Sequence, residues 1–218
     1  MTRRTYLLLP LLLLGLVASG APSLARQLVA ADKPRVSGPL TQGSKRCEAR
    51  KERVNGRVIA VARSCLRFYS FDPAFENNGR RDYGAIWLQV NIDSRRRWCA
   101  TTVKADIIVP NGTKLHAREP KSFNARRRHK VKTKLVVDAR NNASREGVIQ
   151  KRFLLLPRTL RGRTRDDGRV WRTVWHGSSK RLFASASGIE TSWPSEQDLG
   201  DFTARAELRY RIKKKPSC

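Results

Sequence analysis

Apolar and polar side chains alternate along much of this chain, and a period of two is the signature of a β-strand with one buried face. The sharpest case is residues 130–137, where apolar residues and Thr133 alternate with Lys130, Lys132 and Lys134. Residues 202–212 alternate in the same way. We predict strands with one wet face in both segments, and also in residues 86–92 and 99–109.

The spacing of the strand candidates indicates the class of fold. Further candidates are separated by about a dozen residues or more with turn residues between them, which favours antiparallel sheets over βαβ units. They are residues 57–68, 148–156, 169–176 and 180–187. No long stretch carries the apolar stripe of a helix. We therefore expect an all-β fold, an antiparallel β-sandwich forming a single domain over residues 46–218.

One short run resembles a known superfamily. Residues Asp198 to Ala204, in the order Asp-Leu-Gly-Asp-Phe-Thr-Ala, resemble the D-x-G-x-Y-x-C run that opens a late strand in immunoglobulin-like domains. Phe202 stands where that pattern has Tyr, and Ala204 where it has Cys. The resemblance implies an immunoglobulin-like sandwich, and it carries over neither the tyrosine-corner hydrogen bond nor the inter-sheet disulfide.

The N-terminal residues have the three zones of a cleavable secretory signal peptide. Arg3 and Arg4 supply the positive start, residues 7–17 the apolar stretch, and Ser23-Leu24-Ala25 a small-x-small exit. We predict a signal peptide over Met1 to Ala25, cleaved after Ala25, and a secreted or envelope-associated product. An uncleaved anchor is the weaker alternative, because a membrane-spanning helix needs about 20 apolar residues. Residues 26–45 are rich in Pro, Gly and Ser, which predicts a flexible, disordered leader.

The four cysteines fit an oxidising compartment, where disulfides persist. Cys47 and Cys65 flank Asn55-Gly56, a dipeptide typical of a tight hairpin turn, so we predict that these two cysteines pair. Cys99 would then pair with Cys218. Residues 48–52 are also compatible with a helix, which leaves the other connectivities open.

Positive charge is the strongest functional signal in the sequence. The formal net charge is +28, and it becomes +26 once the predicted signal peptide, with two arginines and no acid, is removed. Fields of this size attract polyanions. The cations cluster in runs at 95–97, 126–134, 158–165 and 213–215. From these runs we take the candidate polyanion-binding residues to be Arg95, Arg96, Arg97, Arg126, Arg127, Arg128, Lys130, Lys132 and Lys134.

The expected partner is an anionic cell-wall polymer or membrane surface. Export and the lack of any RNP, KH or zinc-finger pattern argue against nucleic acid. Alternatively, the arginine bias reflects genome composition and part of the charge is a solvated face. The oligomeric state is left open.

No catalytic motif is present, so we expect a non-enzymatic protein without catalytic residues, cofactor or metal. Neither an HExxH motif nor a G-x-S-x-G elbow occurs, and the three histidines are widely spaced. Two alternatives remain. A secreted hydrolase acting on envelope polysaccharide would use acids such as Asp106, Glu190 or Asp198 in a cleft. An interaction module of a surface assembly would need an exposed apolar patch of several hundred Å².

Overall fold

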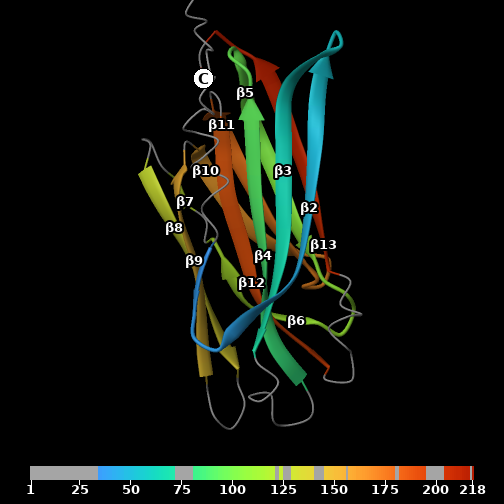
Figure 1. Cartoon of the computed structure of the whole chain (residues 1–218), viewed down its shortest axis with the longest axis vertical. Helices are drawn as coiled ribbons and strands as arrows, with labels where there is room; N and C mark the ends of the chain where they lie inside the picture. Colours follow the sequence, from blue (N-terminus) through green and yellow to red (C-terminus); the bar gives the residue numbers. More distant parts are fainter. Residues whose placement is uncertain are drawn as a thin grey trace, which may run out of the picture.

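The structure is a computed structural model that describes residues 34–71, 81–120, 123–124, 129–139, 145–155, 157–179, 182–194, 204–216 and 218. In these residues every regular element is a strand, and all of the strand pairs are antiparallel. The predicted all-β, antiparallel fold is therefore confirmed (Figure 1). The strands are β1 (Arg35–Ser37), β2 (Leu40–Val54), β3 (Arg57–Phe71), β4 (Arg81–Ser94), β5 (Trp98–Ile108), β6 (Lys114–Glu119), β7 (Phe123–Asn124), β8 (His129–Ala139), β9 (Arg145–Leu155), β10 (Pro157–Arg165), β11 (Val170–Ser179), β12 (Leu182–Pro194) and β13 (Arg205–Lys214).

These strands form three sheets, which we name by letter. Sheet A has the strand order β1-β9-β8, sheet B the order β2-β3-β4-β12-β6, and sheet C the order β13-β5-β11-β10-β7. Two hydrophobic clusters join them. One lies between sheets B and C, and the other lies between sheets B and A. Sheet B is therefore the middle layer of three.

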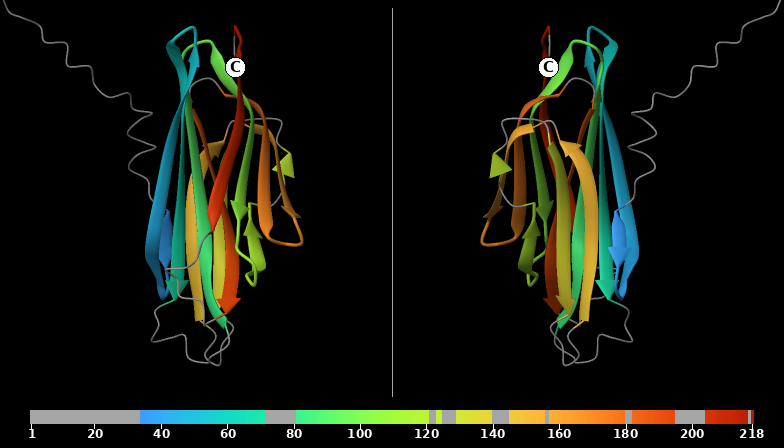
Figure 2. Two further views of the ribbon diagram at one scale, coloured as in Figure 1. Left: turned by 90° about the vertical axis from the view of Figure 1, so that its right-hand side faces the viewer. Right: turned by 90° about the vertical axis from the view of Figure 1, so that its left-hand side faces the viewer.

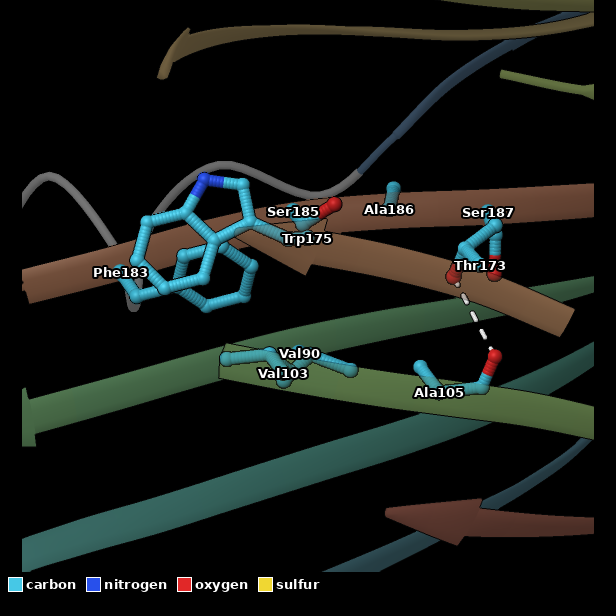
Figure 3. A pocket seen from close by; sticks show the side chains of 9 residues that line it. All are labelled: Val90, Val103, Ala105, Thr173, Trp175, Phe183, Ser185, Ala186 and Ser187. Atoms are coloured by element: carbon cyan, nitrogen blue, oxygen red, sulfur yellow. Dashed lines mark hydrogen bonds between the residues drawn. The ribbon is translucent and has the colours of Figure 1, made fainter. Parts of the chain in front are cut away.

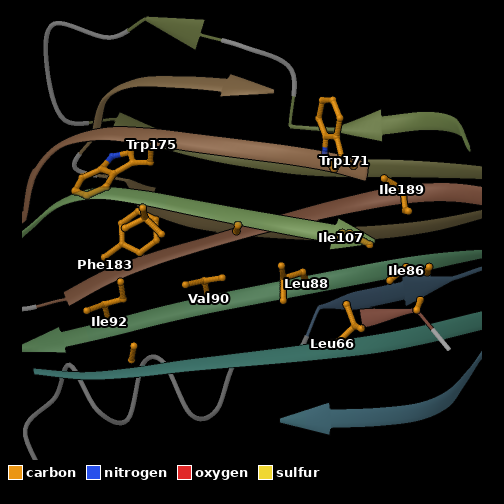
Figure 4. Packing of buried hydrophobic residues seen from close by; sticks show 14 of the residues in the cluster. Leu66, Ile86, Leu88, Val90, Ile92, Ile107, Trp171, Trp175, Phe183 and Ile189 are labelled. Atoms are coloured by element: carbon orange, nitrogen blue, oxygen red, sulfur yellow. The ribbon is translucent and has the colours of Figure 1, made fainter. Parts of the chain in front are cut away.

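The core between sheets B and C is the larger of the two clusters (Figure 4). It contains Leu88 and Ile92 from β4 and, from β11, Trp171 and Trp175, which are 5% and 1% exposed. Trp171 also donates an indole hydrogen bond to the carbonyl of Glu119 at 3.2 Å. Burial of large aromatic surfaces on this scale is a leading source of stability in a β protein.

Strand β4 differs from the expectation of one wet face. Its neighbouring residues Trp87 and Leu88 point to opposite sides of sheet B, yet both are buried, at 0% and 1% exposed. Trp87 packs in the core shared with sheet A, whereas Leu88 packs in the core shared with sheet C. The wet-face prediction is wrong here because sheet A covers the side of β4 that the alternation assigned to water.

Close approach of sheets A and B depends on a glycine in β12. A Cβ atom built on Gly188 would lie 2.7 Å from the ring of Trp87 and 3.2 Å from the side chain of Leu135 in sheet A. Real side chains do not approach that closely, so a larger residue would push the two layers apart.

Both predicted disulfides are present. Cys47 lies directly opposite Cys65 in the β2–β3 hairpin, and the two are bonded. The hairpin turns at Asn55 and Gly56, whose φ values of 46° and 76° are those of a two-residue turn with both residues left-handed. Residues 48–52 are strand, not helix. The second disulfide joins Cys99 in β5 to Cys218.

The segment predicted as a flexible leader is strand in much of its described part. Arg35–Ser37 pairs with β9 as an edge of sheet A, and β2 begins at Leu40, which is 7% exposed in the second core. The Pro and Gly signals mark the short bend between these two strands. Residues 1–33, including the predicted signal peptide, lie outside the described residues. In the part of the chain that is described, no helix is long and apolar enough to cross a bilayer.

Candidate polyanion-binding surface

The outer face of sheet C collects cations from three of its strands. In β13, Ala206, Leu208, Tyr210 and Ile212 pack against the core, which turns the residues between them outward. The same alternation operates in β5 and β11, because Val103 and Trp175 point inward. The exposed cations on this outer face are Lys104, Arg161, Arg163, Arg165, Arg205, Arg209 and Arg211, and we call this set the basic face.

Strand register places these residues in rows across the sheet. Arg209 of β13 lies opposite Lys104 of β5, Lys104 opposite Val174 of β11, and Val174 opposite Arg161 of β10. Adjacent strands are about 4.8 Å apart, so this row spans roughly 14 Å. In β10, successive cations Arg161, Arg163 and Arg165 follow each other at about 6.8 Å, the repeat of two residues. The result is a two-dimensional array and not a single charged run.

Only two carboxylates occupy register positions within this array, and each has a cationic partner. Asp106 is 4% exposed and accepts two hydrogen bonds from Arg172, at 2.7 Å from Nε and 2.5 Å from a terminal nitrogen. That hydrogen bonding raises the pKa of the Arg172 guanidinium. Glu207 accepts a hydrogen bond from the exposed Arg209 at 3.1 Å. An ion pair that exposed is weak, so Arg209 can exchange it for a ligand.

Two recesses lie on the basic face. One, of about 350 Å³, is lined by Thr102, Lys104, His176, Arg209, Tyr210 and Arg211, with no carboxylate among them. The other, of about 320 Å³, contains the Asp106–Arg172 pair together with Arg169, Asp166 and Arg205. The first recess is the more favourable place for an anionic group, since every charge that lines it is positive.

The predicted binding residues do not all lie on this face. Arg95, Arg96 and Arg97 are exposed in the turn between β4 and β5, close to the chain that follows β13: the Lys215 amide donates to the Arg97 carbonyl at 2.8 Å. Lys130, Lys132 and Lys134 occupy β8 in sheet A. Because Leu135 packs against sheet B, the exposed Lys134 points away from it, on the opposite side of the molecule from the basic face. Arg126, Arg127 and Arg128 lie outside the described residues.

Most of the basic face was missed by the search for dense runs. The alternation of residues 202–212 predicts only that Arg205, Arg209 and Arg211 lie on the wet side of a strand. The run at 158–165 is not among the predicted binding residues. The signal was present as arginine at alternate positions in two segments, which places the guanidinium groups on one side of each strand. That these two strands belong to one sheet was not visible in the sequence.

The acids of the hydrolase alternative are separated and structurally engaged. Glu190 is 3% exposed, and its carboxylate accepts backbone hydrogen bonds from Ala117 at 3.1 Å and Asp138 at 3.0 Å. It thereby joins β12 and β6 of sheet B to β8 of sheet A, whereas Asp106 is on the outer side of sheet C. Asp198 lies outside the described residues. Two carboxylates on different layers cannot face each other across one substrate.

The histidines give no clearer reaction centre. The ring nitrogen Nε2 of His116 lies 2.8 Å from the hydroxyl of Ser192, and the ring stacks on Tyr83. A serine–histidine contact is one element of a nucleophilic site. Ser192, however, is only 1% exposed and also accepts a hydrogen bond from Arg81 at 3.0 Å. A buried hydroxyl offers a substrate no path of approach.

A cavity between sheets B and C is too small for an organic substrate. Figure 3 shows its lining, which includes Trp175, Ser185 and Ser187, with Thr173 donating to the Ala105 carbonyl at 3.2 Å. Its volume of about 10 Å³ is close to that of one water-sized sphere. The β12 side of this cavity is lined by the small residues Ser185, Ala186 and Ser187.

In the described part of the chain, no group of three or more His, Cys, Asp or Glu side chains could hold a metal ion. The basic face is thus the one feature described above that joins accessibility, charge and fixed geometry. Neither a protein family model nor a curated protein matches this chain.

Proposed function

We propose that this protein is an exported, non-enzymatic β-sheet protein that binds anionic polymers of the cell envelope through its basic face. The polymer would lie across β13, β5, β11 and β10, where arginines grip phosphate, sulfate or carboxylate groups bidentately. Binding of this kind is electrostatic, tolerant of polymer sequence and sensitive to salt.

The observation that carries the proposal is the arrangement of seven exposed cations on one face of a single sheet, with both carboxylates in the array already paired. Exposed cations also occur in β2 and β8, but in the basic face three strands of one sheet hold them at fixed register positions. Export is part of the proposal because two disulfides are the form that cysteines take in an oxidising compartment.

An immunoglobulin-like identity for the fold remains a proposal of the same kind. It rests on the resemblance of residues 198–204, of which 198–203 lie outside the described residues. An experimental structure that placed Phe202 at the start of a strand, at a corner of the sandwich, would support it; any other placement would count against it.

A charge-matched comparison tests the binding proposal. We would replace Arg161, Arg163 and Arg165 by Gln and measure the salt concentration at which the protein elutes from immobilised heparin. Loss of three contacts should lower the slope of log K against log salt by about 2. Elution should therefore shift to clearly lower salt than for the unmodified protein.

The control variant removes the same charge from elsewhere. Lys45, Lys51 and Arg63 are exposed in β2 and β3 of sheet B, on the side of that sheet turned away from sheet C. Replacing these three by Gln should change elution much less. If both variants elute at the same reduced salt concentration, retention depends on net charge only and the basic face is not a binding site.

A further inference from the structure

One end of the molecule carries a second set of cations, separate from the array on sheet C. We call it the apical end and define it as three segments: the hairpin turn Arg53–Arg57 between β2 and β3, the turn Arg95–Arg97 between β4 and β5, and Lys213–Lys215. Figures 1 and 2 both place these segments side by side at the end where β2 and β13 finish. The residues in them are exposed, apart from the partly exposed Lys215.

The apical end is fixed by contacts between its segments. The Arg95 amide donates to the Ile59 carbonyl at 2.8 Å, which attaches the second turn to the hairpin. The Lys215 amide donates to the Arg97 carbonyl at 2.8 Å, and the Cys99–Cys218 disulfide holds the chain beyond it. Runs that are more than a hundred residues apart in sequence thus form one rigid cationic end. None of the three segments contains an acidic side chain.

An apolar residue stands at the tip of this end. Val54 is 41% exposed, and the only other large hydrophobic residue classed as exposed in the described chain is Val36 of β1. Val54 lies opposite Arg57, two residues beyond the level at which Arg95 bonds to Ile59. At about 3.3 Å per residue, Val54 and its partner Arg57 lie roughly 7 Å beyond the level of Arg95.

The backbone at the arginine turn has an uncommon conformation. Arg97 has a φ of 71°, in the left-handed region where Gly or Asn is ordinarily found. A side chain there costs conformational free energy, and such costs concentrate at functional positions. Arginine at this position places a third guanidinium beside Arg95 and Arg96.

We propose that the apical end docks on an anionic lipid bilayer. The cations would lie among the headgroups, and Val54 would enter the boundary between headgroups and acyl chains, which amphipathic elements penetrate by about 5–10 Å. A soluble polymer offers no apolar layer to receive Val54, and an exposed apolar residue at the tip, flanked by Arg53 and Arg57, therefore favours a lipid surface. This site is independent of polymer binding by the basic face, and either can exist without the other.

Sedimentation with lipid vesicles tests the proposal. The protein without its predicted signal peptide, residues 26–218, should bind vesicles of phosphatidylcholine containing 30% phosphatidylglycerol, and not vesicles of phosphatidylcholine alone. Replacing Arg95, Arg96 and Arg97 by Gln should weaken partitioning to anionic vesicles on the order of 100-fold, at about 1 kcal/mol per charge. The same variant should keep most of its retention on heparin, which separates this result from the test of the basic face.

Two controls make the result specific. The variant with Gln at positions 161, 163 and 165 loses the same charge and should keep its vesicle binding; an equal loss in both variants would overturn the proposal. Val54→Asn should weaken partitioning roughly tenfold while the matched Val36→Asn leaves it unchanged. Unchanged binding of Val54→Asn, or equal binding of both vesicle types by the unmodified protein, would also overturn it. Both valines are exposed, and neither substitution removes a core contact.

Discussion

Replacing Asp106 by Asn should lower the stability of the protein and at the same time strengthen its binding to polyanions. Asp106 is 4% exposed and accepts two hydrogen bonds from Arg172. The substitution keeps the shape of the side chain and removes its charge. Arg172 then loses its hydrogen-bonded counterion and keeps only the weaker attraction of Asp166 and Glu207, which line the same recess.

The size of the loss follows from the burial of the pair. Removing one partner of a fully buried ion pair costs about 3–5 kcal/mol. The Arg172 side chain is 15% exposed, so water screens it in part and we expect about 2–3 kcal/mol. For a protein of this length that corresponds to a fall in Tm of about 5–10 °C. The double variant Asp106→Asn/Arg172→Gln should recover at least about 1 kcal/mol, because it leaves no isolated charge.

Urea denaturation measures the free energy of unfolding, and elution from heparin well below Tm measures binding. The basic face gains one unpaired guanidinium in Asp106→Asn, so this variant should elute at higher salt than the unmodified protein. A folded Asp106→Asn that eluted earlier would refute the assignment of binding to this face. A change in the free energy of unfolding below about 0.5 kcal/mol would refute the account of the ion pair.

Three further outcomes are expected. Removing the Cys99–Cys218 disulfide, whose sequence separation is 119, should cost about 1.7 kcal/mol more in urea denaturation than removing Cys47–Cys65, whose separation is 18, because loop-closure entropy grows with loop length. Burial and a hydrogen bond to Glu52 raise the pKa of Tyr210 above 10.0. The unfolded chain therefore ionises first, and the free energy of unfolding falls as the pH rises above about 10. Tyr210→Phe should be less stable than the unmodified protein at pH 7, but its free energy of unfolding should fall less between pH 10 and pH 11.5. Arg97→Gly should raise the free energy of unfolding by about 0.5–1 kcal/mol, since φ of 71° suits glycine, and a fall would contradict the assigned strain.

The sequence predicted strands best where one face meets water. In β13 the arginines are exposed and the apolar residues between them pack against the core, and in β8 the exposed Lys134 lies between the buried Thr133 and Leu135, so alternation indicates both the strand and its orientation. Strand β10 was not assigned as a strand because Arg161, Gly162, Arg163 and Thr164 contain no apolar residue to mark a period. It is held in sheet C by its pairing with β11 rather than by a hydrophobic face of its own.

The third layer lay beyond what alternation can predict. Alternation with a period of two indicates which side chains share a face of a strand, but it does not indicate what covers that face. Residues 86–92 therefore appeared to have a wet side, although Trp87 and Gln89 are 0% and 6% exposed beneath sheet A. The basic face was missed for a related reason, because β10 and β13 are neighbours only through the order β13-β5-β11-β10.

Sheet B, which sheet A approaches closely at Gly188 and sheet C covers on its other side, is a common wall for two interiors. A residue inserted anywhere in β4 or β12 would invert the side chains beyond it and so spoil both interiors together. The exposed cations on the outer side of sheet C border neither interior and, unlike the buried Asp106–Arg172 pair, can be exchanged in number and sign with little effect on folding. Substitution of these exposed cations can therefore change which ligands the surface attracts, while the residues of the two cores remain constrained by packing.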